Sequence, residues 1–184
     1  MTVLDITTKG TDEVLIDPPV PLPSSKAGDV WNTFSREFLI YAFAGRAACI
    51  IADNYRTSDQ GYLEHVERRD EMTVDGVLYQ LGFSEKCSPD ALARIVGTSD
   101  IWWDAVWIAG FSEHDERRIM RVVRALMDAH RLKISKVETE EELLASTGDG
   151  CGFRWVNPGK PIDEIVTTLT QLAHGIGWNV SRKS

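Results

Sequence analysis

The sequence has few of the features that mark secreted or metal-binding proteins. It holds three cysteines, Cys49, Cys87 and Cys151, which are odd in number and far apart. This pattern favours reduced thiols over a disulfide framework, so we expect a cytoplasmic protein. Neither a CxxC pair nor a zinc-ligand spacing of cysteine and histidine occurs, and no dinucleotide-binding fingerprint is present. We therefore expect no metal and no cofactor.

Long hydrophobic runs are also absent. The longest apolar stretch, residues 38–52, is interrupted by Gly45 and Arg46. It falls short of the roughly 18 to 20 residues that cross a bilayer. The first residues, MTVLDITTKG, lack the basic start and apolar run of a secretory signal. We expect a protein that does not contact a membrane.

Candidate catalytic groups are equally sparse. Cys151, in the segment GDGCGF, is the only nucleophile in an unusual setting. A nucleophile elbow needs a glycine two residues after the nucleophile, and Phe153 stands there instead. A glycine-rich turn is the simpler interpretation, so we expect no catalytic residue and no enzyme. A cysteine-dependent enzyme is the weakest of the alternatives.

What the sequence does contain is an uneven distribution of charge. The net charge is −8, yet residues 117–136, RRIMRVVRALMDAHRLKISK, carry seven of the twenty Lys and Arg residues and one acid, Asp128. The rest of the chain is therefore strongly acidic. Such a field repels polyanions at long range, but a local contact through the basic segment stays open.

The basic segment has the spacing of an amphipathic helix. On a helical wheel the two sides differ: Ile119, Val122, Val123 and Leu126 fall on one, and Arg117, Arg121, Arg124 and Arg131 on the other. Guanidinium groups bind phosphate or carboxylate in bidentate fashion, so the basic side suits a polyanion or an acidic partner. A solvated face balanced by acids elsewhere is the alternative. The residues predicted to bind are Arg117, Arg121, Arg124, Arg131, Lys133 and Lys136.

A tryptophan-rich segment, DIWWDAVWIAGF, precedes the basic one. Trp103, Trp107 and Phe111 recur at helical spacing, with Trp102 beside them. Aromatic side chains bury large areas, so this predicted helix either packs in the core or forms an interface with a partner or with a second copy. A homodimer through this face is one expectation.

Turn and cap residues divide the chain into an extended arm, residues 1–27, and one helical domain, residues 28–184. The arm, with two short strands, is expected to pack loosely. Within the domain, apolar spacing predicts a long buried helix from Val30 to about Tyr55. Other predicted elements are a polar helix near 58–71, a hairpin at Asp75-Gly76 with a helix as the alternative there, a helix after Ser88, a strand at 132–137, an acidic helix or loop at 139–145, a strand at 152–156 and a helix at 161–174.

Two segments of the sequence resemble parts of a known family of domains. Residues 88–100, SPDALARIVGTSD, resemble the first helix and turn of a helix-turn-helix. Residues 121–137, followed by an acidic stretch and GCGFRWV, are similar to the helix, strand, wing and strand of winged-helix domains. The resemblance covers roughly residues 84–157. It implies a mostly α (α+β) fold with a small winged-helix-like antiparallel sheet, and a regulator that binds DNA or only dimerises.

These observations together predict a non-enzymatic regulatory protein that binds DNA or a protein partner through a basic amphipathic helix. The alternative is an acidic inhibitor of the immunity, antitoxin or phage counter-defence type. Such an inhibitor would occupy a basic site on a target protein and would have no affinity for nucleic acid.

Overall fold

The computed structural model describes residues 2–18, 24–53, 65–98, 105–110, 116–128, 131–132, 140–147 and 152–184. The helices are α1 (Ser24–Phe43), α2 (Pro89–Thr98), α3 (Glu116–Leu126) and α4 (Ile162–Gly175). The strands are β1 (Val3–Lys9), β2 (Glu13–Asp17), β3 (Ala48–Asp53), β4 (Arg68–Val74), β5 (Val77–Ser84), β6 (Ala105–Ala109), β7 (Met127–Asp128), β8 (Arg131–Leu132), β9 (Leu143–Thr147), β10 (Gly152–Val156) and β11 (Asn179–Lys183).

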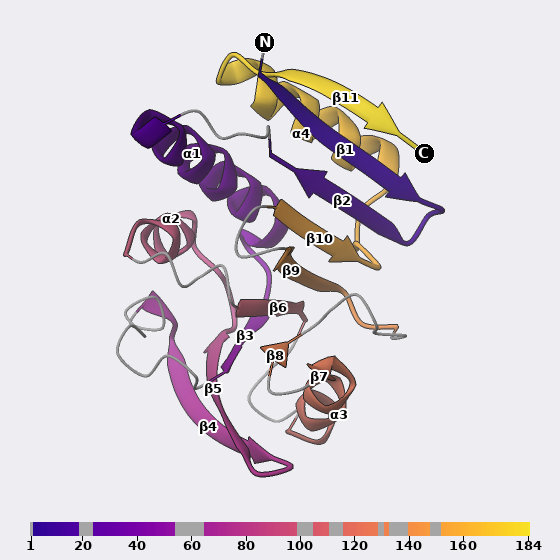
Figure 1. Cartoon of the computed structure of the whole chain (residues 1–184). Helices are drawn as coiled ribbons and strands as arrows, with labels where there is room; N and C mark the ends of the chain where they lie inside the picture. The colour runs from indigo at the N-terminus through magenta and orange to yellow at the C-terminus, as the bar shows by residue number, and fades with distance from the viewer. Residues whose placement is uncertain are drawn as a thin grey trace.

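Nine of these strands form one sheet (Figure 1). Its order is β11-β1-β2-β10-β9-β6-β3-β5-β4, and β7 and β8 form a second, two-stranded sheet. Neighbouring strands are antiparallel except for β1 and β11, which run parallel. The chain crosses from β10 to β11 through α4, so β11 has the same direction as β10 and therefore as β1. The hairpins β1–β2, β4–β5 and β9–β10 supply six of the nine strands.

The predicted fold class, mostly helical with a small winged-helix-like sheet, is wrong. The chain is an α+β mixture built on the large sheet. The region that resembles a winged helix, residues 84–157, contributes β6, β9 and β10, which are adjacent inner strands of that sheet rather than a separate wing. Strands buried on both faces carry apolar residues at every position, and that pattern does not separate them from buried helices.

The two short strands predicted in residues 1–27 are present. They are integral to the sheet rather than loosely packed, because β1 lies between β11 and β2, and β2 pairs with β10. Four of their side chains are almost completely buried: Leu4, Ile6, Val14 and Ile16. The start of the chain is therefore part of the core.

The long helix predicted from Val30 to about Tyr55 ends early. α1 stops at Phe43, Gly45 adopts a positive φ of 78°, and the chain continues as β3. β3 is buried on both faces, with Ala48 and Ile50 in one core cluster and Cys49 in the other. The all-round apolar character of this stretch therefore reflects a central strand.

Three further predicted elements differ from the structure. The helix expected over the tryptophan-rich segment is replaced, from Ala105, by β6, which pairs with β3 and β9. The acidic helix or loop predicted at 139–145 becomes β9 from Leu143. The polar helix predicted near 58–71 becomes β4 from Arg68 onward, and residues 54–64 lie outside the described residues.

The elements with strong local signals are confirmed. Asp75 and Gly76, with φ of 50° and 83°, form the turn of the β4–β5 hairpin, as expected where both central residues need positive φ. α2 begins as predicted, with the Ser88 hydroxyl accepting a bond of 3.1 Å from the Ala91 amide. β10 and α4 form where the sequence places them.

Helices cover both faces of the sheet. α1, α2 and α4 share one core cluster with side chains of β1, β2 and β10, whereas α3 belongs to a second cluster with β4 and β5. The first cluster is rich in aromatic rings, such as Phe38, whose centroid lies 5.1 Å from Phe153 and 5.7 Å from Trp155. None of the helices in the described part of the chain has the length and apolar character that a membrane crossing requires.

A carboxylate just before β9 binds the turn that follows α1. Glu142 accepts a hydrogen bond of 2.9 Å from Arg46 Nη1 at Oε1 and a second bond from Arg46 Nη2 at Oε2. The indole Nε1 of Trp155 also donates to Glu142, at 3.0 Å. The hydrogen bonds from Arg46 to Glu142 raise the pKa of the Arg46 guanidinium. This ion pair anchors the segment just before β9, which also carries Glu141.

Candidate functional site

α3 is held on the sheet by its aliphatic side. Ile119, Val122 and Val123 are 3% exposed or less. They pack in the cluster that includes the buried β4 and β5 side chains Met72 and Leu81. The predicted split of this segment into an aliphatic and a basic face is therefore confirmed for the helical turns that the structure describes.

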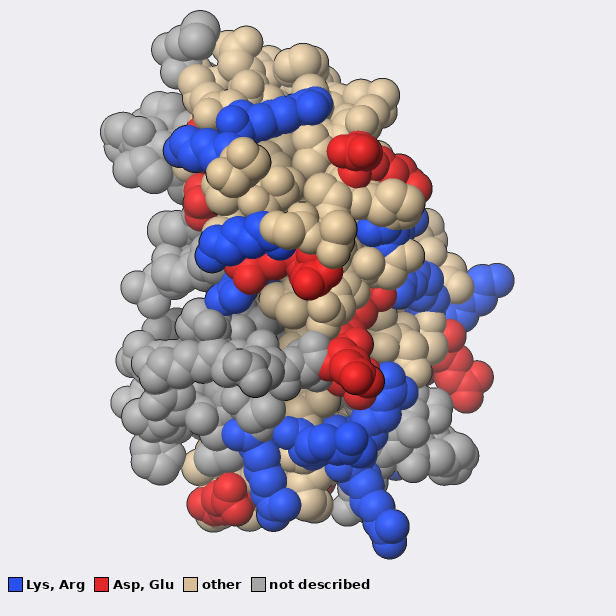
Figure 2. All heavy atoms as spheres, turned by 90° about the vertical axis from the view of Figure 1, so that its right-hand side faces the viewer, with Lys and Arg blue, Asp and Glu red and all other residues tan. Residues whose placement is uncertain are grey.

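The opposite side of α3 carries Arg117, Arg121 and Arg124, which we call the arginine ridge. All three are exposed. Because they stand at i, i+4 and i+7, they fall within about 60° of one another on the helix and span about 10 Å along its axis. Basic side chains gather at the lower end of the face shown in Figure 2, where α3 lies.

The arginine ridge is largely free of acidic partners. Arg124 Nε lies 3.8 Å from Asp75 Oδ1, and both side chains are more than half exposed, so this pair is weak. Arg117 and Arg121 have no ion pair with any residue that the structure describes. Among the described residues, nothing therefore neutralises the Arg117 and Arg121 guanidinium groups.

Arg118, which neighbours the arginine ridge, is paired with a carboxylate. Arg118 Nε donates to Glu141 Oε1 at 2.8 Å, and its Nη2 donates to the other carboxylate oxygen. The Arg118 side chain is 39% exposed and Glu141 is 17% exposed. This fork-to-fork pair joins one flank of α3 to the start of β9 and helps to keep the arginine ridge turned outward.

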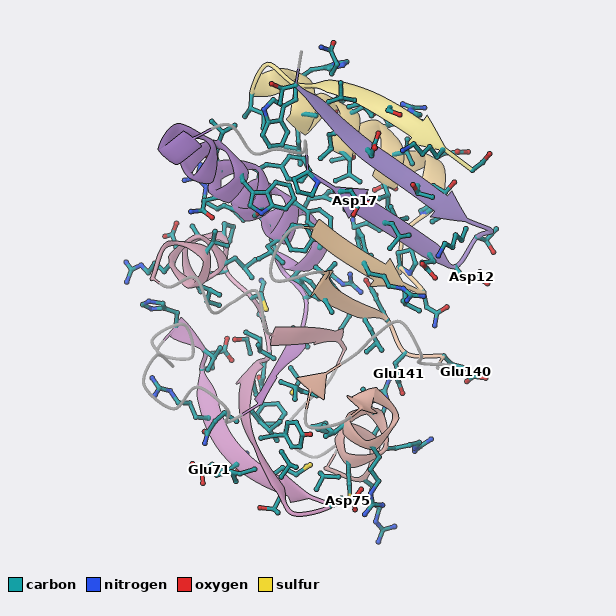
Figure 3. The ribbon with its side chains drawn as sticks, in the orientation of Figure 1. Asp12, Asp17, Glu71, Asp75, Glu140 and Glu141 are labelled. Carbon is teal, nitrogen blue, oxygen red and sulfur yellow. The ribbon has the colours of Figure 1, made fainter. Side chains whose placement is uncertain are left out.

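Acidic residues border the arginine ridge on two sides. Figure 3 shows Glu140 and Glu141 on one side of α3 and Asp75 near its other end, at the β4–β5 turn. Glu141 is already paired with Arg118. The cationic surface is therefore short, and an extended polyanion lying across it would meet carboxylates at its margins.

For the other predicted binding residues, no side chain lies within the described part of the chain. Arg131 lies in β8, and its side chain is outside the described residues, as are Lys133 and Lys136 altogether. Of the predicted aromatic interface, Trp102, Trp103 and Phe111 are outside them too.

The fourth interface residue, Trp107, lies in an inner strand. Its backbone in β6 is in register with Ile50 of β3 and Leu144 of β9. The helical face that this residue was expected to share with Trp103 and Phe111 is therefore not formed at Trp107. The dimer interface stays a prediction.

Metal ligands and reactive thiols are two kinds of group that the described residues can be compared against. Within them, no group of three or more histidine, cysteine or acidic side chains is arranged to hold a metal ion. Burial raises the pKa of the Cys49 thiol, and it raises the pKa of Cys87 to about 11, so neither forms a thiolate nucleophile near neutral pH. Cys151 lies outside the described residues.

Sequence reasoning missed the partners that shape this site. The pairing of Arg118 with Glu141 joins residues 23 positions apart, and Asp75 comes from a hairpin on another part of the sheet. The helical wheel gave one signal, because it places Arg118 about 100° from Arg117 and so off the outward face.

No protein family, curated protein or solved structure matches this chain. Its function is therefore inferred from the residues of α3 and their surroundings.

Proposed function

We propose that this chain is a non-enzymatic regulatory protein that binds an acidic segment of a protein partner through the arginine ridge of α3. The observation that carries this proposal is the exposure of Arg117 and Arg121 without acidic partners among the described residues. Each guanidinium can make two parallel hydrogen bonds to a carboxylate. Arginine is also favoured at the centres of protein interfaces.

The surroundings favour an acidic protein segment over DNA. The arginine ridge covers about 10 Å, which limits it to three phosphate contacts at most. A duplex extends well beyond that length and would approach Asp75 and Glu140, which Figure 3 shows on different sides of α3, whereas an acidic segment as short as the arginine ridge need not reach them. The net charge of −8 also opposes a long polyanion more than a short one.

Fluorescence anisotropy with three labelled probes tests the proposal. The probes are an oligoglutamate of about eight residues, which as a helix matches the length of the arginine ridge, a DNA duplex of about 20 base pairs and an oligoarginine, each titrated with wild type at about 50 mM salt. We expect saturable binding of the oligoglutamate, weakened by added salt, and weaker binding of the duplex. Arg182→Glu, which changes an exposed arginine on the distant strand β11, serves as the control and should bind like wild type.

Each other outcome points to a different function. Tighter binding of the duplex, with a logarithmic salt slope of about −2.7 for three phosphate contacts, would favour a DNA-binding regulator. Failure to bind the oligoglutamate would contradict the proposal. Binding of the oligoarginine alone would favour the acidic-inhibitor alternative.

One observation supports that alternative. On the β1–β2 hairpin, Asp17 lies directly opposite Asp5, and partial burial together with the Asp5 charge raises the pKa of Asp17. Asp5 is paired with Lys183 at 2.8 Å, so the unfavourable charge resides on Asp17. A basic group from a partner would relieve it, which is what an inhibitor that fills a basic site would need.

A further inference from the structure

A hollow of about 350 Å³ lies between α3 and β4. This volume is within the range of about 300 to 1,000 Å³ that is typical of binding pockets. Its base is apolar, with Leu81 and Phe83 of β5 beside Met72. The remaining lining residues are Arg68, Asp70, Glu71, Thr73, Ile119 and Met120.

The hollow adjoins the arginine ridge. Met120 lies along α3 between Arg117 and Arg124, rotated about 60° from Arg117 and about 40° from Arg124. Side chains three or four positions apart on a helix lie about 5 to 6 Å apart at Cβ, so Met120 is next to both arginines. A single ligand can therefore contact the arginine ridge and enter the hollow at the same time.

The charged rim of the hollow is internally compensated. Arg68 Nη2 lies 2.8 Å from Asp70 Oδ2, and the Arg68 guanidinium stands 5.8 Å from the centre of the Phe83 ring. Gln80 Nε2 donates to Glu71 at 2.7 Å. Because these charged groups already have partners within the rim, an uncharged side chain can occupy the hollow.

We infer that the acidic segment is an amphipathic helix that places one apolar side chain in this hollow while its carboxylates contact the arginine ridge. The inference rests on the proposed function and specifies its partner. Carboxylates at i, i+4 and i+7 would match the spacing of the three arginines. Met120 is only partly buried, and its flexible thioether can adapt to an aliphatic or aromatic side chain.

Three helical peptides of equal length and charge provide the test. Each carries glutamates at i, i+4 and i+7, and they differ only at one flanking position, which is alanine, leucine or phenylalanine. We expect the leucine and phenylalanine peptides to bind wild type about fivefold to tenfold more tightly than the alanine peptide, because one apolar side chain leaves water.

Two variants locate the effect. Met120→Gln keeps the length of the side chain and makes it polar, so the preference for leucine over alanine should fall to less than about twofold. Met120→Leu keeps the apolar character and should retain the preference. Circular dichroism and thermal unfolding confirm that both variants keep the wild-type fold.

The results separate this inference from the proposed function. Equal binding of the three peptides to wild type, or a leucine preference unchanged by Met120→Gln, would overturn the apolar anchor and leave the arginine ridge as the binding surface. If none of the three peptides binds, both the apolar anchor and the proposed function are overturned.

Discussion

Replacing Arg117 and Arg121 with glutamate is expected to weaken binding of an acidic peptide about a thousandfold. Each exposed arginine–carboxylate contact is worth about 1 kcal/mol, and a glutamate exchanges that attraction for a repulsion of similar size. Two such replacements total about 4 kcal/mol, which corresponds to nearly three powers of ten in Kd. Anisotropy titration at low salt measures the difference directly.

The fold should tolerate this pair of substitutions, because both side chains are exposed. A matched control is Lys86→Glu with Arg182→Glu, which changes the net charge equally at two exposed positions away from α3. If the control weakens binding as much as the substitutions on α3, the effect comes from the total charge of the protein. That result would remove the specific role of the arginine ridge.

Trp155→Ala is expected to have the largest effect on stability, about 3 to 5 kcal/mol. Trp155 is fully buried, its ring contacts Phe38 and Tyr41, and its Nε1 donates to Glu142. The substitution leaves a cavity and removes one of the bonds to a carboxylate that is mostly shielded from water. The free energy of unfolding of a native protein is only about 5 to 15 kcal/mol, so this loss is a large share of the stability.

Trp155→Phe is the matched variant. Phenylalanine refills most of the cavity but cannot donate to Glu142, so we expect a loss of about 1 to 2 kcal/mol. Urea unfolding of wild type and both variants gives the comparison. A loss below about 1 kcal/mol for Trp155→Ala would show that β10 and α1 are not packed as described.

The sequence predicted the elements whose signals are local. The Asp75-Gly76 turn needs two residues that tolerate positive φ, and Ser88 is placed to cap α2 with its hydroxyl. α4 and β10 likewise stand between clear turn residues. These elements are specified by residues close to one another in the chain, so no knowledge of the tertiary fold is needed to find them.

The inner strands could not be predicted in the same way. β3 and β6 lie inside the sheet, where β3 buries side chains on both faces. In such strands the alternation of apolar and polar residues disappears, and residues such as Ile50 and Trp107 occur at spacings that also suit a helix. The two hairpin strands β1 and β2 were recognised, but their partners β11 and β10 are more than 100 residues away.

The sequence predicted the outward face of α3 but not the ion pairs around it, because only the former depends on residues close together in the chain. Charge and helical spacing are both local, so the outward position of Arg117, Arg121 and Arg124 followed from the wheel. Whether those arginines were paired depended on residues brought in by the fold. Glu141 pairs with Arg118, whereas the neighbouring Arg117 has no ion pair with any described residue, and this distinction required the tertiary structure.

Arginine-specific modification with phenylglyoxal, followed by mass spectrometry, tests directly whether the arginine ridge is free and binds an acidic segment. We expect Arg117 and Arg121 to react fastest and to be protected by bound oligoglutamate, while Arg154, 15% exposed and paired with Glu13, reacts slowly with or without it. Reaction of Arg117 and Arg121 as slow as that of Arg154, or no protection at saturating oligoglutamate, would contradict the proposed role of α3.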